Sequence, residues 1–121
     1  MSGPLAGRSV VVTRPLAQAG ELAALIAAAG GEAVVFPLLE INAAADSAPL
    51  TAAAGKLHDY TLAIFISPNA VDFSVPTLLG CGPWPAGLTT AAVGQGTVRA
   101  LAAHGIHGTV APTERFDSEA L

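Results

Sequence analysis

The feature that most constrains the fold is an alternation between short apolar runs rich in β-branched residues and longer segments with apolar residues at helical spacing. Residues 8–13 form the first run, and in the next segment Leu22, Leu25 and Ile26 share one helical face. Runs of the first kind are typical of buried parallel strands. The alternation, joined by short glycine-containing turns, therefore predicts an α/β fold with flavodoxin-like or Rossmann-like βα units on a parallel sheet.

Glycines and prolines indicate where these elements begin and end. We expect strands over residues 8–13, 32–36, 61–66, 89–93 and 106–111, and helices over residues 16–29, 49–57, 69–79 and 98–104. Gly30 and Gly31 should stop the first helix, whereas Pro76 should kink the third helix or end it early. Residues 117–121 have the pattern of a helix N-cap and first turn.

Composition and patterning argue against a membrane protein. The chain is 52% hydrophobic and only 12% charged, so large faces should be buried. Its longest uncharged run, residues 73–98, contains prolines and glycines that exclude a transmembrane helix. Residues 1–7 lack the basic region of a signal peptide, and the valine run that follows is too short for its apolar core. We therefore expect a cytoplasmic protein without a membrane partner.

Few residues suit ionic or metal-dependent chemistry. The net charge is −4, and the five Lys and Arg residues are scattered, which argues against nucleic acid as a partner. Cys81 is the only cysteine, and His58, His104 and His107 lack metal-ligand spacing, so we expect no metal site. No Ser-His-Asp order or paired-carboxylate motif is present, and the catalytic residues stay unknown.

Polar turns follow three of the expected strands, at residues 13–15, 67–69 and 94–97. The carboxyl ends of parallel strands meet at one edge of a sheet, where helix N-termini favour carboxylate or phosphate. A purely structural interpretation is also open, because Ser67 or Asn69 can simply cap a helix.

The third turn and Arg14 are equally ambiguous. Gly94 and Gly96 permit positive φ and close ligand approach, while Thr97 can cap the helix and still present its hydroxyl. Arg14 can reach a carboxylate or remain solvated. The turn resembles half of a phosphate-binding fingerprint, so a phosphate- or nucleotide-binding α/β module is an alternative function. A flavodoxin-like receiver or docking domain is a third, although strand one lacks the acidic cluster that Mg²⁺ needs.

Several short motifs occur in a specific order and spacing. They are VVTRP at 11–15, QA at 18–19 followed by Leu22, PLLEI at 37–41, IFISPNAV at 64–71, AVGQGT at 92–97 before Ala100 and Leu101, and DSEAL at 117–121. In these motifs the chain resembles uroporphyrinogen-III synthase, and the resemblance runs from about Arg8 onward. The resemblance implies two α/β domains joined by a two-stranded linker. Residues 1–36 would be a piece of the first domain, 37–41 linker, and 42–121 most of the second domain, which is inserted into the first.

The resemblance also implies an activity. The family is a lyase that dehydrates and cyclises hydroxymethylbilane with inversion of the last pyrrole ring, giving uroporphyrinogen III in porphyrin and haem biosynthesis without a cofactor or metal. It holds this polycarboxylate tetrapyrrole largely through main-chain N–H groups at strand–helix turns. The substrate-binding residues implied in this chain are Arg14, Ser67, Asn69, Ala70, Val71, Gly94 and Thr97.

Part of the family pattern is not found in this chain. A tyrosine proposed to help the hydroxyl leave belongs to a segment beyond Leu121, and Tyr60 is not assigned its role. We therefore expect the chain alone to be inactive as a synthase. The strand and helix within residues 1–36 would lack most of their packing partners, and their exposed apolar faces should promote self-association.

Overall fold

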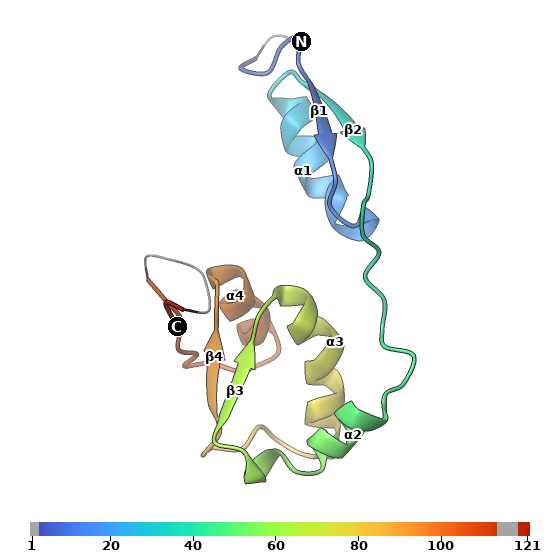
Figure 1. The fold of residues 1–121 in the computed structure, drawn as a ribbon. Helices are drawn as coiled ribbons and strands as arrows, with labels where there is room; N and C mark the ends of the chain where they lie inside the picture. Colours follow the sequence, from blue (N-terminus) through green and yellow to red (C-terminus); the bar gives the residue numbers. More distant parts are fainter. Residues whose placement is uncertain (1–2, 114–118) are drawn as a thin grey trace. The chain divides into compact units, whose positions relative to one another are not determined.

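The computed structural model describes residues 3–113 and 119–121. The chain divides into two compact units, Met1–Asn42 and Ala43–Leu121, each with its own hydrophobic core. Both units combine a pair of parallel strands with helices (Figure 1). The predicted α/β class with parallel strands is therefore confirmed, whereas the proposed domain boundaries stay a prediction. Within the described ranges, no helix is long and apolar enough to cross a membrane.

The first unit consists of two parallel strands connected by one helix. Its elements are β1 (Ser9–Val12), α1 (Leu16–Ala28) and β2 (Glu32–Val35). Val12 of β1 is buried against Ala19 and Ile26 of α1, and these three side chains form the centre of its core. The helical spacing found in the sequence marks the side of α1 that packs on the strands at Leu22 and Ile26, but Leu25 is 62% exposed and lies outside this core.

Two glycines end α1 as expected. Gly30 has φ of 87°, a left-handed conformation that side chains disfavour. Its N–H donates to the carbonyl of Ala27, and the N–H of Gly31 donates to the carbonyl of Ile26, both at 3.0 Å. These two bonds form a Schellman motif, which satisfies carbonyls at the helix end.

The opposite side of the β1–β2 pair is apolar and exposed. Val11 and Val34 lie side by side in the strand register and are 58% and 41% exposed. Phe36, just after β2, is 61% exposed. This surface fits the expected self-association, which stays a prediction.

The second unit has a parallel strand pair with helices on one side. Its elements are α2 (Ala48–Ala54), the 3₁₀ helix η1 (Leu57–Asp59), β3 (Leu62–Phe65), α3 (Pro68–Leu78), the 3₁₀ helix η2 (Leu79–Cys81), β4 (Thr89–Ala92) and α4 (Gln95–Ala103). Phe65 and Ala92 are partners in the strand register, and both belong to the core that α3 and α4 complete. Leu101 of α4 and Val71 of α3 are fully buried there.

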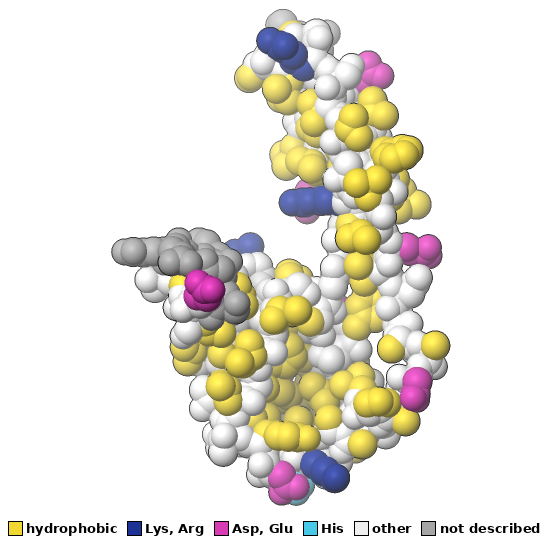
Figure 2. Space-filling model, in the orientation of Figure 1, with side chains coloured by type: hydrophobic (Ala, Val, Ile, Leu, Met, Phe, Trp, Pro, Cys, Tyr) yellow, Lys and Arg dark blue, Asp and Glu magenta, His cyan; other side chains and the backbone are white. Residues whose placement is uncertain are grey.

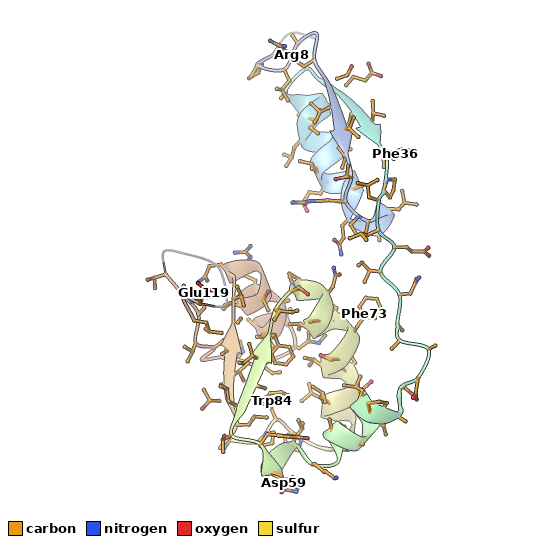
Figure 3. All side chains as sticks on the ribbon, viewed as in Figure 1. Arg8, Phe36, Asp59, Phe73, Trp84 and Glu119 are labelled. Atoms are coloured by element: carbon orange, nitrogen blue, oxygen red, sulfur yellow. The ribbon has the colours of Figure 1, made fainter. Side chains whose placement is uncertain are left out.

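Trp84 closes one end of this core (Figure 3). Its indole Nε1–H donates to the Thr90 hydroxyl at 3.1 Å, and its ring centroid lies 6.1 Å from that of Phe65. The polar tip of the indole is thus satisfied while its apolar body packs against an aromatic ring.

Two predictions about this unit need correction. Of the two effects expected of Pro76, an early end is not found, because α3 continues past it to Leu78. The strand expected over residues 106–111 is reduced to a single bridge between Ala91 and Val110. Gly108, with φ of 74°, interrupts the extended backbone there. Of the helix start expected at 117–121, residues 117 and 118 lie outside the described residues, and residues 119 and 120 form a turn and not a helix.

Candidate functional site

Two strand–helix turns meet at the carboxyl edge of the β3–β4 pair. Ser67 follows β3 and begins α3, while Gly94 follows β4 and begins α4. Because the strands are parallel neighbours, both helix N-termini lie at the same edge (Figure 1). They also adjoin, since a Cβ atom added at Gly96 would lie only 3.6 Å from Cγ of Pro68. The structure thus brings together the second and third polar turns of the sequence.

The N-terminus of α3 is closed by its own residues. Ser67 is the N-cap, in extended conformation, and its hydroxyl oxygen accepts the N–H of Ala70 at 3.1 Å. The Ser67 carbonyl accepts the N–H of Val71 at 3.3 Å. Pro68 has no N–H to offer. The capping interpretation of Ser67 is therefore confirmed.

The other expected binding residues of this turn are only partly accessible. Asn69 and Ala70 are half-buried in the first turn of α3. Val71 is fully buried in the core, so its side chain faces away from any ligand at the sheet edge. The backbone N–H groups of Ala70 and Val71 are already used within the turn, which leaves α3 a weaker anion site than its sequence indicates.

The N-terminus of α4 is open. Its N-cap, Gly94, has no side chain to accept a hydrogen bond, and the N–H groups of Gln95 and Gly96 donate to no acceptor within the described part of the chain. Helix N–H groups in this position carry partial positive charge. A carboxylate or phosphate oxygen placed at this turn would therefore find unused donors.

The predicted roles of Thr97 and the two glycines need correction. The helix begins at Gln95 and not at Val98, so Thr97 lies inside its first turn, is only 3% exposed, and is not the cap. Gly94 has φ of −132°, and neither it nor Gly96 has positive φ. Gly94 instead leaves open space at the turn, because a Cβ atom added there would have no atom within 4 Å beyond its own residue and the two next to it in the chain.

Arg99 belongs to this site, although the sequence reasoning missed it. It lies on α4, and its Nη2 atom would be 3.8 Å from a Cβ atom at Gly96. Residues three apart share one face of a helix, so the guanidinium folds back toward the open first turn. A helix that started at Val98 would leave Gly96 outside it, so the predicted helix start offered no reason to place Arg99 near Gly96. Because α4 starts at Gln95, both residues lie on the same helix. The combination of free helix N–H groups and an arginine favours a carboxylate or phosphate ligand.

Arg14 lies in the first unit, in the turn between β1 and α1, and is exposed. The backbone beside it is held by the N–H of Leu38, which donates to the carbonyl of Thr13 at 3.2 Å. Arg14 thus occupies the carboxyl end of β1, as predicted, on a different unit from the other six expected residues.

Ionisable groups elsewhere form no catalytic cluster in the described ranges. No group of three or more His, Cys, Asp or Glu residues could hold a metal there. His104 Nε2 lies 3.2 Å from an Asp72 carboxylate oxygen, which joins α4 to α3 at the surface. Cys81 is exposed and unpaired. The groups that the site does present, the helix N–H groups of α4 and Arg99, suit anion binding.

Comparisons with known proteins identify the family. The family profile described as uroporphyrinogen-III synthase HemD matches residues 20–121. A uroporphyrinogen-III synthase of Synechococcus elongatus is 33% identical over 120 residues, which cover 98% of this chain and 45% of the relative. The chain therefore spans less than half the length of this curated relative. Because the profile covers most of the sequence and both matches carry the same description, the chain belongs to the uroporphyrinogen-III synthase family.

Proposed function

We propose that this chain supplies a carboxylate-binding part of a cytoplasmic lyase that converts hydroxymethylbilane to uroporphyrinogen III. The reaction would dehydrate and close the linear tetrapyrrole with inversion of its last pyrrole ring. The observation that carries the proposal is the open N-terminus of α4, with the unused N–H groups of Gln95 and Gly96 beside Arg99, in a chain of this family. Arg14 stays a proposed carboxylate ligand of the first unit.

Such a site suits a polycarboxylate in spite of the net charge of −4. Backbone N–H groups at a helix N-terminus attract anions without excess basic side chains, and Arg99 adds a planar donor for one carboxylate. Ser67 would hold the adjoining turn in place, and Asn69 and Ala70 would line the edge near Gly94. The buried Val71 and Thr97 would support that edge from within the core. Loss of the substrate hydroxyl is intrinsically easy. An enzyme that holds the linear tetrapyrrole in a folded arrangement would therefore need neither cofactor nor metal.

Replacing Gly94 with serine should close α4 as Ser67 closes α3. Gly94 already has the extended backbone of an N-cap and room for a side chain, so the new hydroxyl would accept the N–H of Gly96, one of the two unused donors. We expect the stability to rise by a few tenths of a kcal/mol and the affinity for uroporphyrin III to fall about fivefold, as one donor is taken. Isothermal titration calorimetry and urea unfolding measure the two changes. Gly87→Ser, in the exposed loop before β4, is the control that should alter neither.

Arg99→Gln should weaken binding of uroporphyrin III by about fivefold, the effect of losing one exposed charged contact of about 1 kcal/mol. Lys56→Gln removes the same charge from an exposed position before η1, on the amino side of β3, and should leave the affinity unchanged. Equal losses in both variants would mean that net charge, and not the α4 site, attracts the ligand.

The same titration distinguishes the alternative function. A phosphate- or nucleotide-binding module would bind ATP, NAD or FMN more tightly than uroporphyrin III, because one turn with two glycines suits a single phosphate group. The proposed function requires the opposite order of affinities.

A further inference from the structure

We draw no further inference here: the strongest candidate, the open groove of about 470 Å³ that Leu16 at the start of α1 and residues 37–40 line on the first unit, where hydrophobic side chains lie exposed (Figure 2), is an unpartnered apolar face, and nothing in the structure shows what covers it.

Discussion

Hydroxymethylbilane added to the 121-residue chain is expected to close only to the type I isomer, at the rate seen in buffer. Forming the type III isomer requires the whole tetrapyrrole to be held folded while its last ring inverts. Positioning of this kind would supply most of the rate enhancement over the reaction in buffer. The open turn of α4 and Arg99 can hold a carboxylate, but more than half of the matched relative lies outside the aligned region. Chromatography of the oxidised uroporphyrins separates the two isomers.

The matched control is the full-length Synechococcus elongatus relative under the same conditions, which should yield type III. Type III isomer above the spontaneous background in the reaction of the 121-residue chain would show that this chain alone holds and inverts the substrate. In that case Gly94→Ser and Arg99→Gln should reduce the yield.

Leu101→Ala should cost the second unit about 2–5 kcal/mol, the usual range for a buried leucine in a well-packed core. Leu101 is fully buried, and it packs with side chains of β3, β4 and α3. Its carbonyl also accepts the N–H of Ile106 at 2.9 Å in the turn that ends α4, so the residue joins the core to that turn. A loss of this size is a large fraction of a small domain's stability.

Urea unfolding followed by the fluorescence of Trp84, the single tryptophan, measures the change. Leu62→Ala removes the same atoms from a half-exposed position in the same unit and should cost less than about 0.5 kcal/mol in the 121-residue chain. A similar cost for both variants would contradict the assignment of Leu101 to the centre of the core.

Much of the fold follows from local chemistry. The β-branched run before Thr13 became β1, the apolar spacing through Ile26 became α1, and Gly30 ended that helix in the left-handed conformation the pattern indicates. These signals are strong because each depends on nearby residues. The strand predicted over residues 106–111 does not form, because Gly108 interrupts the extended backbone with a positive φ. The number of apolar residues in a segment does not indicate such a backbone break.

The site was less predictable than the fold. The two turns at Ser67 and Gly94 resemble each other in sequence position, but one is closed by a hydroxyl and the other is open. That difference depends on where each helix begins, and an error of three residues at α4 misassigned Thr97 and hid Arg99. Element ends are the least certain part of any sequence-based prediction, whereas an anion site at a helix start depends entirely on them.

The packing of α3 and α4 on a single face has a consequence for the place of the Ser67 turn. Because β3 and β4 are parallel and each is followed directly by its helix, α3 and α4 start at the same edge of the strand pair. The positive ends of both helix dipoles therefore lie at that edge. The capped turn at Ser67 would then add electrostatic attraction for an anion held at Gly94, although its own N–H groups are already used.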